Sequence, residues 1–135
     1  MLTLEQLEND GFKVDPPLFF CYIAEDAVSK QAIGHILTSF RYSSYDGKQL
    51  HIEDMYVKEE HRNKGIGRRL FHQAALLAER ENSNAMAWEC TSWNETAIKF
   101  YKSVGALNET EIRQWEVYSL EGQDFHKFLQ DMSSE

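Results

Sequence analysis

A short turn rich in glycine and basic residues constrains this chain more than any other feature. It reads Arg62-Asn-Lys-Gly65-Ile-Gly67 and lies between a β-forming run and the best amphipathic helix of the sequence. Glycines let a backbone approach a ligand closely, and the first N–H groups of a helix have no partner within the helix. Together with the helix dipole, such a turn forms a cradle for a phosphate or pyrophosphate. An ordinary turn with solvated charges is the alternative, and the hexapeptide alone favours neither.

The charge distribution supports an anionic ligand at this turn. The 135 residues include 14 basic and 22 acidic ones, a formal net charge of −8, which argues against a broad nucleic-acid-binding surface. Between Lys58 and Arg69, however, five basic residues stand against two acidic ones, a local charge of +3 that leaves −11 for the rest of the chain. A phosphate loop and a dinucleotide fingerprint are both excluded, the latter because Leu70 occupies the place of the third glycine.

Composition indicates a single globular domain over residues 1–135. Hydrophobic residues make up 42% and charged residues 27% of the chain, which is typical of a protein with a packed core. Cys21 and Cys90 lie in apolar runs, which predicts buried thiols rather than a disulfide or a metal site. No apolar stretch approaches the ~20 residues of a membrane span, and the N-terminus lacks the pattern of a signal peptide. We therefore expect a cytoplasmic protein with no membrane partner.

Hydrophobic periodicity and turn residues predict a mixed α/β domain. Along the third strand, simple alternation puts Glu53 and Asp54 on opposite faces, so they are not expected to act as a carboxylate pair. That alternation groups Leu50, Ile52, Asp54 and Tyr56 on one face and His51, Glu53, Met55 and Val57 on the other. The expected strands are Leu18–Ala24, Ala32–Tyr42, Leu50–Val57, Ala85–Cys90 and Ile112–Leu120, and the expected helices are Thr3–Asn9, Gly65–Asn82, Asn94–Val104 and Glu121–Asp131.

Two blocks of the sequence resemble the GCN5-related N-acetyltransferase (GNAT) superfamily. The turn at Arg62 resembles that superfamily's Gln/Arg-x-x-Gly-x-Gly/Ala loop, which binds the pyrophosphate of acetyl-CoA. The run Asn94-Glu-Thr-Ala-Ile-Lys-Phe-Tyr101-Lys-Ser-Val-Gly105-Ala resembles its Asn-x-x-Ala-x-x-Phe-Tyr-x-x-x-Gly-Phe helix. Both blocks occur in the right order, with a helix and a strand between them. The resemblance implies the α/β GNAT fold, a mixed, mostly antiparallel sheet flanked by helices and truncated at its N-terminus.

Within the superfamily, the chain resembles the diamine (spermidine/spermine) and thialysine acetyltransferase branch. The strand Leu50–Val57 is similar to that branch's Leu-x-Leu-Glu-Asp-x-x-Val, and Trp93-Asn-Glu95 to its Trp-Asn-Glu. The segment Leu2–Phe12 resembles its second helix, and Trp115 falls at the spacing of its late tryptophan. The resemblance therefore covers nearly the whole chain.

The chain departs from the branch at three points. The usual first strand and first helix, which form part of the amine pocket, do not precede Leu2. Arg113 stands where the branch has an acidic residue, and Ala87 where it has a histidine in the fourth strand. A CoA-binding module or an inactive truncated form is therefore an alternative to an active enzyme, and acetylation of a protein amine is another.

The resemblance implies direct transfer of acetyl from acetyl-CoA to a small primary amine, which is a diamine, a polyamine or a lysine-like amino acid. It assigns Tyr101 to protonate the departing thiolate and Glu53 to accept the amine's proton through water. Glu53, Asp54, Glu89 and Trp115 are the candidates for substrate binding, although a backbone-bonded carboxylate and a core tryptophan are alternatives for Asp54 and Trp115. The resemblance also implies a homodimer, and no nucleic acid or metal is expected. The residues implied to bind the coenzyme are Met55, Tyr56, Val57, Arg62, Asn63, Lys64, Gly65, Ile66, Gly67, Arg68, Asn94, Ala97 and Tyr101.

Overall fold

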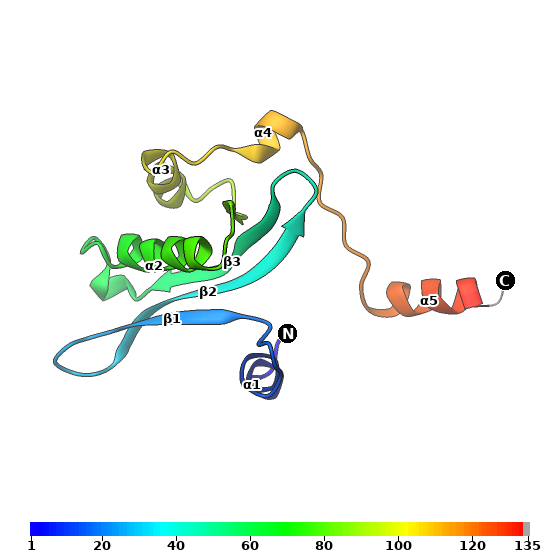
Figure 1. Cartoon of the computed structure of the whole chain (residues 1–135), viewed down its shortest axis with the longest axis horizontal. Helices are drawn as coiled ribbons and strands as arrows, with labels where there is room; N and C mark the ends of the chain where they lie inside the picture. The colour runs from blue at the N-terminus through cyan, green and yellow to red at the C-terminus, as the bar shows by residue number, and fades with distance from the viewer. Residues whose placement is uncertain (134–135) are drawn as a thin grey trace. The chain divides into compact units, whose positions relative to one another are not determined.

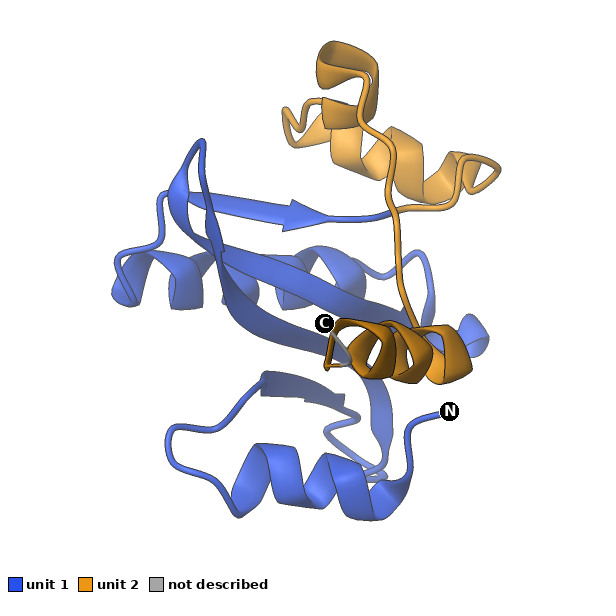
Figure 2. Ribbon diagram, turned by 90° about the vertical axis from the view of Figure 1, so that its right-hand side faces the viewer, with its two compact units in different colours: residues 1–89 blue, residues 90–135 orange. Residues whose placement is uncertain are grey.

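The computed structural model of the chain describes residues 1–133. These residues fall into two compact units, Met1–Glu89 and the segment from Cys90 onward, which Figure 2 colours separately. Each unit has its own local architecture. The single domain predicted over residues 1–135 stays a prediction, and its last two residues lie outside the described residues.

A four-stranded sheet in the order β1-β2-β3-β4 forms the first unit (Figure 1). The strands β1, β2 and β3 are antiparallel, and β3 and β4 are parallel. The β2–β3 hairpin turns between Ser43 and Gly47, and the parallel connection runs through helix α2, because parallel strands need a long crossover. The bounds are Phe20–Glu25 for β1, Ala32–Ser43 for β2, Gly47–Val57 for β3, Ala85–Trp88 for β4 and Ile66–Arg80 for α2.

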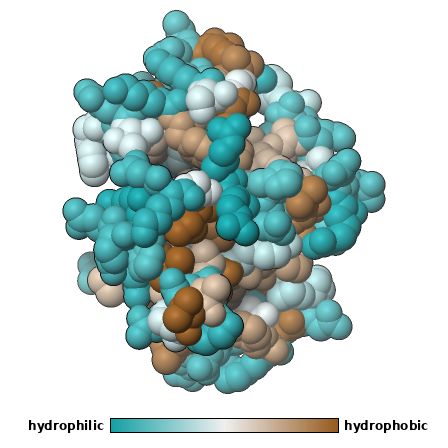
Figure 3. Space-filling model, turned by 90° about the vertical axis from the view of Figure 1, so that its left-hand side faces the viewer, coloured by the Kyte–Doolittle hydropathy of each residue, from teal (hydrophilic) through white to brown (hydrophobic). Residues whose placement is uncertain are grey.

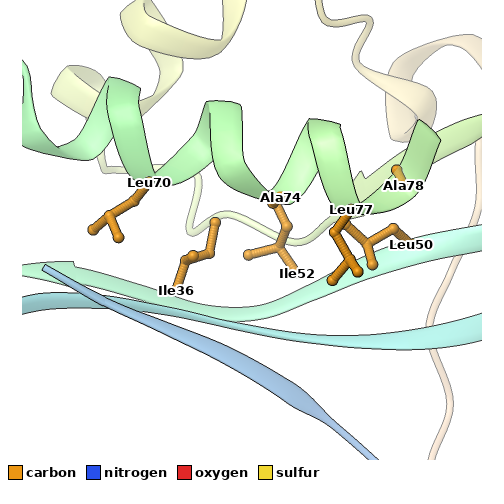
Figure 4. Close-up of a cluster of buried hydrophobic side chains, with 7 residues drawn as sticks. All are labelled: Ile36, Leu50, Ile52, Leu70, Ala74, Leu77 and Ala78. Carbon is orange, nitrogen blue, oxygen red and sulfur yellow. The ribbon is translucent and has the colours of Figure 1, made fainter. Parts of the chain in front are cut away.

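Helix α2 packs on one face of this sheet and forms the core with it (Figure 4). Its apolar residues recur at helical spacing, so they line one stripe of the helix. Burial of each large apolar side chain stabilises the fold by about 1.5–3 kcal/mol, and this contact fixes the start of α2 near the end of β3. The buried cluster consists of Ile36, Leu50 and Ile52 from the strands and Leu70, Ala74, Leu77 and Ala78 from α2.

The remaining helices begin where side-chain caps are available. In the first unit, α1 (Leu4–Phe12) starts with a capping box between Thr3 and Gln6, and a short 3₁₀ turn, η1 (Glu59–His61), precedes α2. In the second unit, α3 (Glu95–Ser103) is capped by the side chain of Asn94, which accepts from the Ala97 N–H at 3.2 Å. The last helix, α5 (Gly122–Ser133), lies near the predicted span.

The strand predicted at Ile112–Leu120 is wrong. Residues Glu109–Arg113 form helix α4, because the side chain of Asn108 accepts from the backbone N–H groups of Thr110 and Glu111 at the first turn. An ion pair between Glu109 and Arg113, one turn apart, supports the same helix. Residues 114–121 belong to neither a helix nor a strand. The apolar residues of this run therefore do not build a strand, which needs a neighbour to pair with.

Both cysteines are exposed, so the prediction of buried thiols is wrong. The thiol of Cys21 is nevertheless partly shielded from water by its neighbours. This partial burial, followed by the charge of Asp54, raises the pKa of the thiol above its ordinary value. Figure 3 shows that apolar residues reach the surface between polar ones on the face it displays. Apolar runs in this chain therefore include surface positions, and apolar neighbours alone do not bury a thiol.

None of the helices within residues 1–133 combines the length and the hydropathy that crossing a bilayer requires. That finding concerns the described helices alone. The expected cytoplasmic location stays a prediction.

Candidate functional site

A one-residue bulge in β3 determines which side chains the site contains. Leu37 of β2 pairs with Asp54, whereas the next residue of β2, Thr38, pairs with Ile52. Glu53 is therefore the extra residue of β3. A bulge of this kind bends the strand and redirects the side chains that follow it.

The bulge reverses the predicted alternation of β3. Leu50 before the bulge and Met55 and Val57 after it all pack against the core beneath α2. In a regular strand, Met55 and Val57 would point away from a face that contains Leu50. Glu53 and Asp54 consequently share the face opposite α2, which corrects the expectation that these adjacent carboxylates lie on opposite faces.

Glu53 is held by hydrogen bonds from two neighbours. Its Oε1 accepts from Ser39 Oγ at 2.8 Å and lies 2.9 Å from Nδ1 of His51. The other ring nitrogen of His51, Nε2, lies 3.0 Å from Oε2 of Glu89. His51 is only 7% exposed, while the side chains of Glu53 and Glu89 are 47% and 71% exposed. A row of carboxylate, imidazole and carboxylate therefore starts at the bulge of β3 and ends just past β4.

The surroundings of Glu53 keep its carboxyl group ionised at neutral pH. Burial alone would raise its pKa, but hydrogen bonds from Ser39 and His51, with the charges of His51 and Arg41, outweigh burial and lower the pKa below the ordinary value. An ionised, half-exposed carboxylate attracts an ammonium group and orients a water molecule.

Asp54 contacts a different histidine. Its Oδ2 lies 2.6 Å from Nε2 of His35, and its side chain is 65% exposed. The His35 ring also lies beside the ring of Tyr56, with the centroids 6.2 Å apart. Asp54 is thus an outward carboxylate paired with an imidazole, which differs from the backbone-bonded carboxylate considered as its alternative. Glu53 and Asp54 therefore have separate partners.

The second half of β3 leaves an open backbone edge within the first unit. The strand β4 pairs with β3 only from Gln49 to Ile52, whereas β3 continues to Val57. Beyond Ile52, no strand of the first unit lies on this side of β3. Backbone N–H and C=O groups at such an edge can pair with an extended ligand as an added strand does. Met55, Tyr56 and Val57, which are expected to bind the coenzyme, lie on this stretch.

The N-terminus of α2 has the features of an anion site. Gly65 is the N-cap residue and has φ +77, a left-handed conformation that favours glycine. No side chain caps the helix, and its first turn has no acidic residue but does contain Arg68. An α-helix of 15 residues usually has acidic residues or a capping side chain at this end. The first N–H groups of α2 and the nearby positive charge therefore suit an external anion.

Arg62 ties the loop before α2 to the end of β3. Its Nε donates to the backbone oxygen of Val57 at 2.8 Å, and its guanidinium lies 5.5 Å from the centre of the Tyr56 ring. Asn63 and Lys64 follow in the exposed loop, where Asn63 has φ +61. The predicted coenzyme residues from Met55 to Arg68 thus form one continuous part of the first unit.

The second unit contains the other predicted site residues. Asn94, Ala97 and Tyr101 lie at the N-cap and on successive turns of α3. Burial, followed by the charge of Cys90, raises the pKa of Tyr101, so its phenol remains a proton donor at neutral pH. Trp115 lies just after α4, with the guanidinium of Arg113 5.6 Å from its ring centre.

Sequence reasoning misses three residues that contact the carboxylates, namely Ser39, His35 and His51. The spacing of His51 and Glu53, two positions apart on one strand, is a signal that could have identified His51. Ser39 and His35 lie on β2, and their partners depend on a register that the bulge shifts. Within residues 1–133, no group of three or more His, Cys, Asp or Glu side chains could hold a metal ion.

Known proteins are similar to this chain over most of its length. The model of the Acetyltransferase (GNAT) family matches residues 2–106. The chain is 31% identical over 128 residues to the thialysine N-epsilon-acetyltransferase of Bos taurus, which covers 90% of this chain and 75% of that protein. It is 34% identical over 122 residues to the spermidine/spermine N(1)-acetyltransferase-like protein 1 of Homo sapiens, which covers 87% of this chain and 17% of that protein. A solved integron cassette protein from the mobile metagenome of V. cholerae matches with a TM-score of 0.74 and 26% identity, covering 95% of this chain and 78% of its own.

Proposed function

Because this chain belongs to the acetyltransferase (GNAT) family and is an N-acetyltransferase, we propose that it transfers acetyl from acetyl-CoA directly to a small primary amine. The amine class is a diamine, a polyamine or a lysine-like amino acid. The observation that carries this proposal is the pair of outward carboxylates at the bulge, Glu53 and Asp54, beside the open edge of β3. The relatives named for thialysine and for spermidine/spermine support the same amine class.

Coenzyme binding is assigned to the end of β3 and the start of α2. The backbone of Met55 to Val57 would pair with the extended pantetheine arm as an added strand. The N–H groups that follow Gly65 would bind the pyrophosphate, with Lys64 and Arg68 adding positive charge. Asn94 and Ala97 on α3 would flank the pantetheine arm. When bound, acetyl-CoA supplies an acetyl group activated as a thioester.

The chemistry assigned to the protein side chains is movement of protons. A primary alkylammonium has a pKa of about 10.4, so Glu53 would accept one proton through a bound water to produce a neutral amine. The amine nitrogen then forms a bond to the acetyl carbon, and the carbon–sulfur bond breaks. Tyr101 would donate its phenol proton to the departing thiolate and recover one from the attacking nitrogen or from solvent. No acyl-enzyme is required.

The preference for a cationic amine follows from charge. Glu53, Asp54 and Glu89 form an acidic face of the sheet, and the chain as a whole has a net charge of −8. A diamine or a lysine-like substrate has a second cationic group, which one of these carboxylates would bind while Glu53 serves the reacting nitrogen. Such long-range charge also speeds encounter with cations at low ionic strength.

A thiol-release assay with a panel of amines tests the proposal. We expect acetyl-CoA to raise the melting temperature, and thiol release to follow with putrescine, spermidine or thialysine. Stabilisation by the coenzyme without release by any amine would identify a binding module instead. Release only with peptides would contradict a small-amine substrate. The expected homodimer is part of this proposal, and light scattering of the purified chain measures its mass directly.

A further inference from the structure

Outside the residues assigned above to coenzyme and amine, the ring of His51 is a buried polar group on the site face. It lies on β3 between two small neighbours, because Ser39 pairs with it from β2 and Ala87 from β4. Residues directly opposite one another on adjacent strands share a face, so these small side chains leave room for the ring. His51 is 7% exposed, and both of its ring nitrogens are engaged.

The bonding of His51 links two carboxylates that do not belong to the same strand. Nδ1 contacts Glu53 Oε1 at 2.9 Å, while Nε2 contacts both oxygens of Glu89, at 3.1 and 3.0 Å. Ionised carboxylates only accept hydrogen bonds, so both bonds form together when the ring donates from both nitrogens. The ring then fixes the orientation of the Glu53 carboxylate and compensates part of its charge.

We propose that His51 is a positioning residue of the acetyl transfer, which acts by donating from Nδ1 to Glu53 and anchoring its own Nε2 on Glu89. This inference rests on the proposed function, in which Glu53 accepts the proton of the amine. The side chain of Glu53 at the bulge is half-exposed, so several rotamers are open to it. Loss of the hydrogen bond from His51 would let the Glu53 carboxylate move away from its reactive position. A displacement of about 1 Å in a catalytic group can lower the reaction rate by about 100-fold. The hydrogen bond from Nδ1 of His51 therefore determines how well Glu53 accepts the proton of the amine.

Two substitutions separate the bonds of the two ring nitrogens. In His51→Asn, the amide nitrogen occupies the position of Nδ1 and retains the donor to Glu53. In His51→Gln, the amide nitrogen occupies the position of Nε2 and retains the donor to Glu89 while the donor to Glu53 is lost. We expect kcat to stay within about threefold for His51→Asn and to fall about 10- to 100-fold for His51→Gln, with KM little changed. His72→Asn and His72→Gln, at an exposed position of α2, are the matched controls.

A readout without catalysis accompanies the kinetics. Carbon NMR of the side-chain carboxyl of Glu53 measures its pKa in the wild type and in each variant. The groups that face this carboxylate are Ser39 and Arg41 from β2 and His51 from β3, with Glu89 beyond β4 acting through His51. We expect the pKa of Glu53 to rise in His51→Gln and to remain nearer its wild-type value in His51→Asn.

Specific outcomes overturn the inference. Equal loss of kcat in the two variants would mean that His51 merely supports the fold, and melting temperatures reveal whether the loss comes from unfolding. An unchanged kcat and an unchanged pKa of Glu53 in His51→Gln would exclude a positioning role. If the wild type releases no thiol with any amine, the proposed function fails, and the titration of Glu53 still decides whether His51 orients it.

Discussion

Glu53 and Asp54 are adjacent in the chain and yet project from the same face of β3, because Glu53 is the extra residue of a bulge. Each carboxylate contacts its own imidazole, His51 for Glu53 and His35 for Asp54. The two carboxylates therefore have separate hydrogen-bond partners and do not share one. Two neighbouring negative charges on a sheet face suit a substrate with more than one amino group.

The substitution Glu53→Gln tests the role of the bulge carboxylate in catalysis. The amide has nearly the same shape and can still accept from Ser39 and His51, but it cannot take up a proton. We expect kcat to fall about 100-fold or more at neutral pH, while the affinity for CoA stays within about twofold. Steady-state kinetics and calorimetric titration with CoA measure the two quantities. Asp54→Asn is the comparison, and an equal loss of kcat in both variants would argue against a distinct role for Glu53.

The stability of the protein should depend on Glu53 at acidic pH. The folded-state pKa of Glu53 is lowered, so the stability that its charge contributes is complete above the unfolded value of about 4.3 and is lost as pH falls through the folded value. The side chain is 47% exposed, so solvent screening limits this contribution to less than about 1 kcal/mol. Urea unfolding measures the free energy of unfolding of the wild type and of Glu53→Gln between about pH 6 and about pH 3, the range in which carboxyl groups titrate. The difference between the two free energies should shrink as the pH falls. A difference that widens on acidification would contradict the direction of the pKa shift.

Alanine substitutions at the two glycines near the start of α2 should have different effects. A Cβ at Gly67 would meet only Val57 Cγ2, at an ordinary 3.9 Å, so we expect Gly67→Ala to leave the free energy of unfolding within about 0.5 kcal/mol. Gly65 has φ +77, and Gly65→Ala should cost about 1 kcal/mol or more. Both variants should bind CoA more weakly, by about 10-fold, because in the proposed site the coenzyme would approach the backbone there. Unchanged CoA affinity in both would rule out the assigned pyrophosphate site.

The substitution Tyr101→Phe tests the proton donor proposed for the thiolate. It removes only the phenol oxygen, so the helix α3 and its cap at Asn94 remain. We expect kcat to fall about 10- to 100-fold, with CoA affinity and melting temperature little changed. Stopped-flow measurement of thiolate release gives the rate of the step itself. Tyr118→Phe, in the segment after α4, is the control, and a wild-type rate in Tyr101→Phe would exclude the phenol as the donor.

Neighbouring leucines of α2 provide a test of the core. Leu77 is 2% exposed and packs in the buried cluster, whereas Leu76 is 40% exposed. We expect Leu77→Ala to reduce the free energy of unfolding by about 2–5 kcal/mol and Leu76→Ala by less than about 1 kcal/mol. Chemical denaturation of both variants measures the difference. Similar losses would mean that α2 does not present the stripe at Leu70, Ala74 and Leu77 to the sheet.

Local interactions made several elements predictable from the sequence. The capping side chains of Thr3 and Asn94 bond to N–H groups three residues away, and the stripe of α2 is visible as a helical period. The glycines before α2 also signal a left-handed turn, because few other residues adopt positive φ. Each of these features depends on residues close together in the chain, so short-range patterns are sufficient to find them.

The sequence by itself determined the order of strands and helices in the first unit, the glycine-rich turn before α2 and the residue types available for acetyl transfer. The tertiary structure alone decided that Glu53 is bulged and that His51 lies between Glu53 and Glu89. These outcomes depend on which strand pairs with which residue across the sheet. The pairing register depends on residues that are far apart in the sequence, so local sequence patterns do not predict it. A shift of one residue moves every following side chain to the other face of the sheet.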